Sequence, residues 1–103
     1  MRDYTFHTVR GRVVVKDDEL VLPASHRTSH WPKAEVAAVT IEGLIRIQTG
    51  TVDTYGVVSH EAGQHPIVNV TRKDGTSRTF EDVTESALEL ASQLNLRGYP
   101  VSA

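Results

Sequence analysis

Five histidines are the side chains of this sequence that could bind a metal ion or move a proton near neutral pH. Two of them, His60 and His65, flank Glu61 in a segment that approaches the spacing by which a helix presents two histidines to zinc. The offset of five residues turns His65 away from His60 on a helix, and Gly63 weakens such a helix. The sequence therefore favours a loop here and leaves a small histidine-dependent metal-binding enzyme as an alternative.

Other arrangements that could support catalysis are less complete. His26 and His30 are separated by four positions, but the residues around them, Pro32 included, argue against a helix, and in a strand the two would stand about 13 Å apart. Ser59-His60-Glu61 is contiguous, and neighbouring side chains point apart in a strand, so this run does not form a triad locally. The chain has no cysteine, and its glycines are dispersed. We expect a protein that is not an enzyme and uses no cofactor.

Basic and aromatic residues supply candidate contacts for a partner. Arg72, Lys73 and Arg78 flank one predicted hairpin and would form a local basic patch, or else the solvated face of an edge strand. Trp31 lies beside a proline and Tyr99 follows the predicted helix. Each aromatic ring could anchor an interface, or pack into the protein's own core. These residues are the candidate partner-binding positions.

Composition restricts the class of protein. The 103 residues suit a single domain spanning 1–103, and with few aromatic residues the core must consist mainly of Val, Ile and Leu. A net charge of -2 provides no general attraction to nucleic acid or to an anionic membrane, and we expect neither as a partner. The N-terminus shows no apolar run of signal-peptide length, from which we expect a cytoplasmic protein.

The first four fifths of the chain have the pattern of a β protein. Short runs rich in Val, Ile and Thr, separated by Gly, Asp and Asn, predict successive strands from about residue 4 to 80. Val13–Val15 and Leu20–Leu22 form a predicted hairpin whose second strand ends at Pro23. The polar segment Ser25–His30 is expected to be a loop or an edge strand.

Further strands are expected towards the end of this region. In Leu44–Ile47 the two isoleucines share one face, and the leucine and arginine share the other. The segments 52–59 and 67–72 are two strand candidates, with residues 61–64 as a hairpin loop between them. Asp74-Gly75 readily supplies the positive φ values of another tight turn.

The spacing of the apolar residues changes after Phe80. Asp82-Val83-Thr84-Glu85 has the spacing of a capping box, so a helix is predicted from about 83 to 96, with Gly98 as its left-handed cap. Its apolar residues recur at spacings of three and four and must bury their stripe against the sheet. We therefore predict a mostly β (α+β) fold. About seven antiparallel strands form a bent sheet or partly open barrel, capped by one C-terminal amphipathic helix.

This order of hairpins and a capped terminal helix resembles that of a bacterial pleckstrin-homology-like (PH-like) domain. The likeness rests on the hairpin Gly11–Leu22, the segment Trp31–Val39, and the run Asp74–Phe80 leading into Val83–Leu94. The resemblance implies a scaffold that binds phosphoinositide headgroups, peptides or proteins, usually without catalysis.

The charges of that hairpin depart from the lipid-binding pattern of the family. Lipid-binding members carry several basic residues on the first hairpin, whereas here Asp17, Asp18 and Glu19 occupy the turn, although Arg10, Arg12 and Lys16 lie nearby. Carboxylates at that place would repel a phosphate. The sequence therefore favours a protein partner over a lipid.

The expected function is that of a non-enzymatic protein-interaction module, an adaptor or inhibitor of a larger complex or a homodimer. It would act through a sheet edge or a groove between that edge and the helix. A histidine-dependent metal enzyme and a phosphoinositide or membrane-surface binder are the alternatives.

Overall fold

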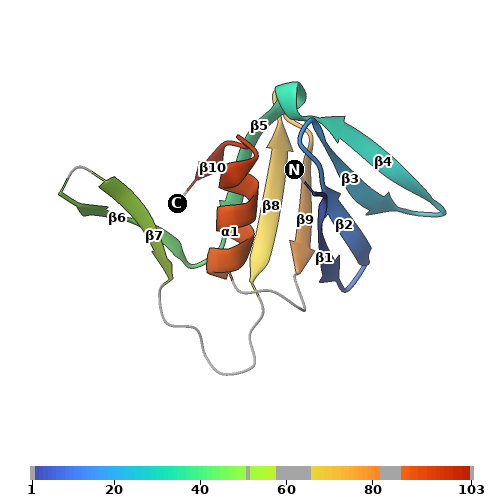
Figure 1. Ribbon diagram of the computed structural model, residues 1–103. Coiled ribbons are helices and arrows are strands. Elements are labelled where there is room, and N and C mark those ends of the chain that lie inside the picture. The colour runs from blue at the N-terminus through green and yellow to red at the C-terminus, as the bar shows by residue number, and fades with distance from the viewer. Residues whose placement is uncertain (1, 51, 58–65, 82–86, 103) are drawn as a thin grey trace.

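The computed structural model describes residues 2–50, 52–57, 66–81 and 87–102 as three sheets and one helix (Figure 1). The first sheet is an antiparallel meander in which each strand pairs with the next along the chain. Its strands are β1 (Tyr4–Thr8), β2 (Gly11–Val15), β3 (Glu19–Ala24) and β4 (Arg27–Pro32).

The second sheet has the strand order β10-β5-β8-β9. Its strands are β5 (Val36–Ile41), β8 (Ile67–Arg72), β9 (Ser77–Glu81) and β10 (Val101–Ser102), and the 3-10 helix η1 (Lys33–Glu35) connects β4 to β5. β10 runs parallel to β5, and the other pairs are antiparallel. β6 (Leu44–Thr49) and β7 (Val52–Val57) form a separate two-stranded sheet, here called the arm, which extends to one side of the body (Figure 1).

Alternation of side chains along the strands builds one core. Val13 and Val15 of β2 are buried, as are Leu20 and Leu22 of β3, because alternate residues of a strand face the same side. The buried apolar side chains of both four-stranded sheets, the base of the arm and the helix belong to a single cluster. Its members are Phe6, Val13, Val15, Leu20, Leu22, Trp31, Val36, Val39, Ile41, Leu44, Val68, Val70, Phe80, Leu90, Ala91, Leu94, Tyr99 and Val101.

The helix α1 (Ala87–Leu96) packs its apolar stripe into this core. Leu90, Ala91 and Leu94 are buried, whereas Leu88 and Leu96 are exposed, so a narrow stripe faces inward. The predicted mostly β class with one helix near the C-terminus is confirmed. The capping box at 82–85 lies outside the described residues.

The predicted end of the helix is also confirmed. Gly98 has a φ of 83°, a left-handed conformation that glycine adopts without steric cost. The N–H of Tyr99 donates to the carbonyl of Leu94 at 3.1 Å, which closes the last turn. No helix among the described residues is long and apolar enough to cross a membrane.

The predicted number of strands was too low. The described residues contain ten strands, and the sheets are open, so the expectation of about seven strands in one bent sheet or barrel needs correction. The predicted all-antiparallel arrangement is also wrong at β10, because this two-residue strand pairs with β5 in parallel. A strand this short has no periodicity of its own from which it could be predicted.

Pro23 does not end the strand in which it lies. β3 continues to Ala24, and Pro23 pairs with Thr28 of β4. The ladder between β2 and β3 extends only from Val14↔Val21 to Val15↔Leu20, so on that side of β3 Pro23 is paired with no described strand. A proline is tolerated there because no ladder hydrogen bond needs its missing N–H.

The predicted hairpin between 52–59 and 67–72 is wrong. β7 pairs with β6, and β8 pairs with β5 and β9, although β8 has the predicted bounds. The loop at 61–64 lies outside the described residues. The Asp74-Gly75 turn is confirmed, since it joins β8 to β9 and Gly75 has a φ of 93°.

We predict that Leu90→Ala lowers the free energy of unfolding by about 2–5 kcal/mol, because it leaves a cavity beneath α1. Leu88→Ala is the matched control on the same helix: Leu88 is 44% exposed and Leu90 is 0% exposed, so the control should cost about 1 kcal/mol or less. Urea denaturation of the two variants measures the difference. Equal losses would contradict the inward orientation of Leu90.

Candidate functional site

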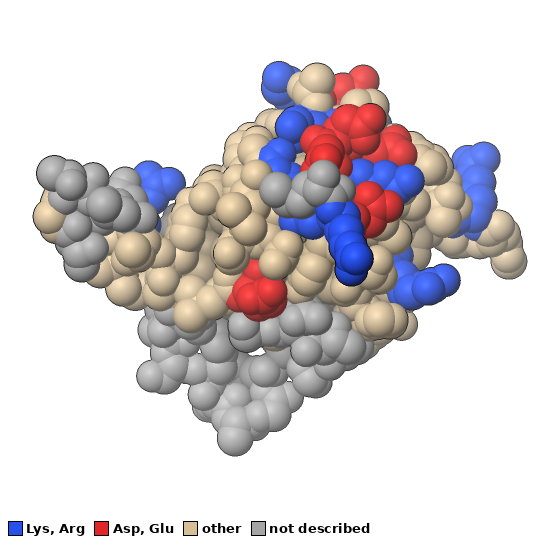
Figure 2. Space-filling view, in the orientation of Figure 1, with Lys and Arg blue, Asp and Glu red and all other residues tan. Residues whose placement is uncertain are grey.

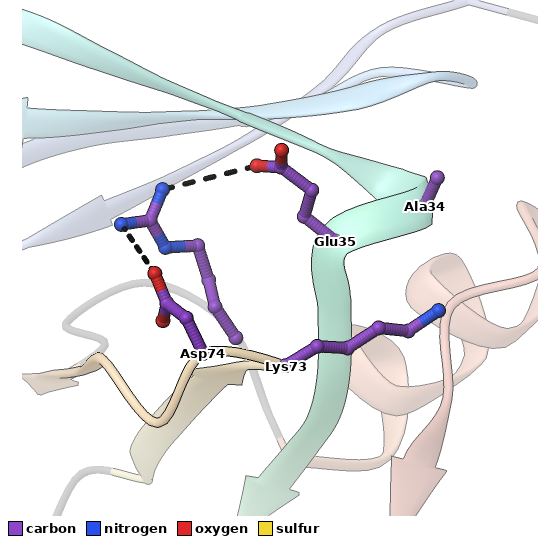
Figure 3. Close-up of a pocket in the computed structure, with 5 residues that line it drawn as sticks. Ala34, Glu35, Lys73 and Asp74 are labelled. Carbon is purple, nitrogen blue, oxygen red and sulfur yellow. Dashed lines mark ion pairs between the residues drawn. The ribbon is translucent and has the colours of Figure 1, made fainter.

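Arg72 lies between two carboxylates at the junction of η1 and the β8–β9 turn. Its guanidinium is 3.9 Å from Glu35 and 3.4 Å from Asp74, and it stacks over the ring of Trp31 at 4.7 Å. A cavity of about 310 Å³ lies here, and its lining consists of Ala34, Glu35, Arg72, Lys73 and Asp74. Figure 3 shows the carboxylates of Glu35 and Asp74 directed towards this guanidinium, while the side chain of Lys73 extends away from them.

The charges in this cavity are compensated. The N–H of Thr76 donates to Asp74 at 2.8 Å and lowers the pKa of Asp74 below its usual value, with a further contribution from the positive charge of Arg72. A carboxylate held in its ionised form beside a guanidinium is a poor proton donor or acceptor near neutral pH. The ion pairs of Arg72 therefore have a structural role, in which they join the β8–β9 turn to η1, and the geometry does not favour a reactive site.

Arg78 belongs to a different site from Arg72 and Lys73. Its Nη2 atom donates to the carbonyl of Pro23 at 2.6 Å, and its guanidinium lies over the ring of Phe80 at 5.5 Å. This contact joins β9 of the second sheet to β3 of the first. The three basic residues predicted as one patch are thus divided between two places on the protein.

A second cavity, of about 370 Å³, adjoins Arg78. Its lining includes Arg10 from the β1–β2 turn and Ser25 from the β3–β4 turn, with no carboxylate among the described residues that line it. His26, in the same β3–β4 turn, has a φ of 70°, which is uncommon for a residue other than glycine. Two arginines and a hydroxyl are groups that bind oxyanions.

The turn that carries Arg10 is the first hairpin of the fold. β1 pairs with β2 from Tyr4↔Val15 to Thr8↔Gly11, so residues 9 and 10 form the first turn. The acidic turn that contains Asp17 and Asp18 joins β2 to β3 and lies at the other end of β2, about 17 Å away along the strand. The predicted hairpin of Val13–Val15 and Leu20–Leu22 with these carboxylates in its turn is confirmed, but it is the second hairpin of the chain and not the first.

The surface shows the same separation of charge. Figure 2 shows acidic side chains gathered with basic ones over one end of the molecule, and basic groups without acidic neighbours on the side of the β1–β4 sheet. A phosphate near Arg10 would therefore meet little repulsion from the acidic turn, because a Debye length of about 8 Å screens charges beyond it at physiological ionic strength.

Trp31 and Tyr99 lie in the core. Trp31 is 4% exposed and Tyr99 is 2% exposed, which leaves little of either ring for a partner to contact. The hydroxyl of Tyr99 donates to the carbonyl of Lys16 at 2.8 Å, and the ammonium of Lys33 is 5.9 Å from its ring. Tyr99 therefore connects the segment after α1 to the β2–β3 turn.

Arg97 is a structural residue that directly follows α1. Its side chain is buried and donates to the carbonyl and the side-chain oxygen of Gln93 and to the carbonyl of Arg2. Asp17 lies 4.0 Å from its Nε atom. The signal in the sequence was its position just after the predicted helix, but nothing local indicated that the N-terminal segment would contact it.

Only some of the histidines lie among the residues that the structure describes. His30 lies on β4 with its Nδ1 atom 3.1 Å from Glu19, and His26 lies in the β3–β4 turn. His60 and His65 lie outside the described residues, as does Ser59. Within the part of the chain that the structure describes, no group of three or more His, Asp or Glu side chains is arranged to hold a metal ion.

The arm presents an apolar face that the sequence analysis did not consider as a site. Leu44 is buried at its base and Tyr55 packs against the core, whereas Ile45 and Ile47 are each 41% exposed on the opposite face. A methyl group added to Gly56 would come within 2.6 Å of the Cδ1 atom of Ile47, so this isoleucine lies flat over the glycine. Ile45, Ile47 and Gly56 thus form an uncharged apolar patch, here called the arm patch.

No family model matches the chain, and no curated protein matches it.

We predict that stability declines as the pH rises above about 10, in part through Tyr99. Burial raises the pKa of Tyr99 above its ordinary value of 10.0, and the carboxylates of Asp18, Glu19 and Asp17 add to the shift. A raised pKa means that the folded state favours the neutral phenol over the phenolate. The stability that neutral Tyr99 contributes is therefore complete below the pKa of the unfolded chain, and it is lost as the pH rises towards the pKa of the folded protein.

The measurement is the midpoint of urea unfolding between pH 8 and 11 for the native chain and for Tyr99→Phe. The variant should be less stable at pH 8, because it loses one hydrogen bond, and should show a shallower decline at alkaline pH. Parallel pH profiles would contradict this role of Tyr99.

Proposed function

We propose that this chain is a non-enzymatic protein-interaction module that holds its partner through the arm. The observation that carries this proposal is the pair of exposed isoleucines, Ile45 and Ile47, on a hairpin that extends from an otherwise well-packed body. A partner that covers both side chains would gain about 1–2 kcal/mol from each. Such exposed apolar side chains on a projecting element are typical of docking surfaces.

The arm is attached firmly enough to present this patch. Tyr55 packs against the core and its hydroxyl lies 3.5 Å from the carbonyl of Val101, while the guanidinium of Arg46 is 6.0 Å from its ring. β7 also contacts α1. These contacts lie on one face of the arm, so the opposite face, which carries the arm patch, is left for a partner.

The architecture supports the proposal that the chain is a PH-like scaffold. The resemblance depended on successive hairpins followed by a terminal helix, and the described strands and α1 occur in this order. In this view the arm is a hairpin between β5 and β8, and the module acts as an adaptor or inhibitor of a larger complex. A scaffold of this kind recognises a partner without chemical reaction.

We predict that Ile45→Lys abolishes capture of the partner from the native cell, because it places a charge in the centre of an apolar contact. Ile67→Lys is the matched control, since Ile67 is 39% exposed, close to the 41% of Ile45, and lies on β8. The measurement is affinity capture with quantitative mass spectrometry for the native chain and both variants. A set of captured proteins that does not change with Ile45→Lys would contradict the use of the arm.

A second candidate function is supported by the cavity beside Arg10 and Arg78. Two guanidinium groups and the hydroxyl of Ser25 provide donors for a phosphate-bearing headgroup, with no carboxylate among the described lining residues. The carbonyl of Pro23 and the ring of Phe80 hold Arg78 in place. This candidate corresponds to the phosphoinositide or membrane-surface binder considered as an alternative from the sequence. Its site would be the cavity beside the β1–β2 turn.

We predict for this candidate that Arg10→Gln weakens binding to vesicles containing a phosphoinositide by about tenfold, because it removes a charged donor. Arg27→Gln is the control, since Arg27 is exposed in β4 and does not line the cavity. Co-sedimentation with vesicles measures lipid binding, and titration with a soluble inositol phosphate separates headgroup from membrane. Absence of binding at low salt, or equal losses in both variants, would reject this candidate.

A further inference from the structure

The cavity of about 370 Å³ beside the β1–β2 turn, here called the arginine cavity, is formed where three segments are held together. The N–H of Val9 donates to the carbonyl of Glu81 at 3.3 Å, which joins the β1–β2 turn to the end of β9. A Cβ atom added to Gly11 would lie 3.1 Å from the Cβ atom of Pro23, so the start of β2 packs closely against β3. Arg78 of β9 donates to the carbonyl of Pro23 at 2.6 Å. Contacts within the fold therefore hold the walls of the arginine cavity in place.

Two guanidinium groups give the arginine cavity its charge. Arg10 is exposed, and its side chain forms no hydrogen bond or ion pair with a described residue. Arg78 donates through Nη2 to Pro23, whereas its Nε and Nη1 atoms donate to no described residue. Arg72 differs, because two carboxylates compensate its charge. The arginine cavity therefore attracts an anion, since no carboxylate lies among its described lining residues.

Charge balance favours a ligand with a single phosphate group. A phosphate monoester carries a charge of about −1.5 to −2 at pH 7 and three acceptor oxygens. Two guanidinium groups can neutralise this charge and bind the oxygens in the bidentate geometry that arginine favours. Among the other described lining residues, Pro23, Ala24 and Ser25, only Ser25 adds a polar side chain, and it is uncharged. A phosphoinositide headgroup carries an additional phosphate at its link to the lipid, so its charge exceeds what these residues balance.

The charge of the whole chain favours a phosphorylated protein over a membrane. An anionic membrane acts on the charge of the whole protein, and a net charge of -2 provides no attraction to it. A phosphorylated side chain needs only the local charge of the cavity. Val9 is 65% exposed beside Arg10 in the same turn, so the residue next to the phosphate would gain an apolar contact. Because Arg10 and Ser25 are exposed, the phosphate would lie near the surface, within reach of a short side chain.

We propose that the arginine cavity binds a phosphorylated serine or threonine of a partner protein. Arg10 and Arg78 bind the phosphate oxygens, the hydroxyl of Ser25 donates a further hydrogen bond, and Val9 contacts the neighbouring residue of the partner. The proposal rests on the proposed function as a protein-interaction module, and it names a chemical group by which the partner is recognised. It assigns the cavity of the second candidate function to a phosphorylated protein in place of a lipid headgroup.

The first test is an NMR titration with N-acetyl-phosphoserine amide, a probe that carries the phosphate without a peptide. The backbone amide signals of Arg10, Ser25 and Arg78 should shift with a dissociation constant in the millimolar range, because the probe makes only the phosphate contacts. N-acetyl-serine amide is the matched control and should leave these signals unchanged. Absence of shifts at about 20 mM probe, or shifts confined to other residues, would overturn the proposal.

The second test asks whether Arg10 binds the phosphate. Arg10→Gln should weaken binding of the phosphoserine probe about tenfold or more, because it removes a charged donor. Arg27→Gln is the control, because Arg27 is exposed on β4 and does not line the cavity. Circular dichroism of both variants verifies that they are folded. Equal affinities of the two variants for the probe would show that Arg10 takes no part, and the proposal would be wrong.

The third test separates a phosphorylated protein from other sources of phosphate. The best peptides from a library with a central phosphoserine and randomised flanks should bind about tenfold more tightly than inorganic phosphate, because they add contacts to Val9. Equal affinity for inorganic phosphate and for these peptides would indicate a free anion as the ligand and overturn the proposal. Binding to phosphoinositide vesicles without binding to the peptides would support the second candidate function in its place.

The cavity and the arm can fail separately. Ile45→Lys should retain binding of the phosphoserine probe, since Ile45 does not line the cavity, and phosphatase treatment of the cell extract should abolish capture of the partner by the native chain. Capture that survives both phosphatase and Arg10→Gln but is lost in Ile45→Lys would overturn phosphate recognition and leave the proposed function standing. Capture that is lost in Arg10→Gln and unchanged in Ile45→Lys would overturn the use of the arm and support the cavity.

Discussion

The buried guanidinium of Arg97 joins the parts of the chain that must come together for this fold. It lies just after α1, donates to the carbonyls of Gln93 and Arg2, and is near Asp17. A charge in the interior is tolerated only when hydrogen bonds replace its lost hydration. Because those acceptors come from the N-terminus and the helix, the two Nη atoms of Arg97 form their hydrogen bonds only when both segments are in place. The Nε atom has no hydrogen-bond partner and lies 4.0 Å from Asp17 in the β2–β3 turn. Tyr99 reinforces the junction through the carbonyl of Lys16.

Arginine has the same structural use elsewhere in the body. Arg72 stacks on Trp31 between two carboxylates, and Arg78 stacks on Phe80 while it donates to Pro23. In each case the planar cation covers the edge of the core and joins elements from different parts of the chain. Two of the three residues whose charges suggested a binding patch, Arg72 and Arg78, therefore join elements of the two sheets.

Strand pairing determines where charges act. Arg10 and Asp17 are close in sequence, but β2 separates them and places them at opposite ends of one strand. The carboxylates of the acidic turn, which would repel a phosphate, lie at one end of β2. The cavity beside Arg10 and Arg78 lies at the other end. The arm is similarly a consequence of pairing, since β6 and β7 pair with each other and not with the larger sheets. The two proposed functions thus use surfaces that differ in position and in chemistry.

The sequence by itself determined the features that depend on neighbouring residues. The strand Ile67–Arg72, the Asp74-Gly75 turn, the stripe of α1 and its cap at Gly98 were predictable, because side-chain period and positive φ values are local properties. Only the tertiary structure decided which strands pair, that β10 adds to β5, and which charged side chains are buried. These features depend on contacts between residues far apart in the chain, and the burial that favours them exists only after the sheets and helix have packed together.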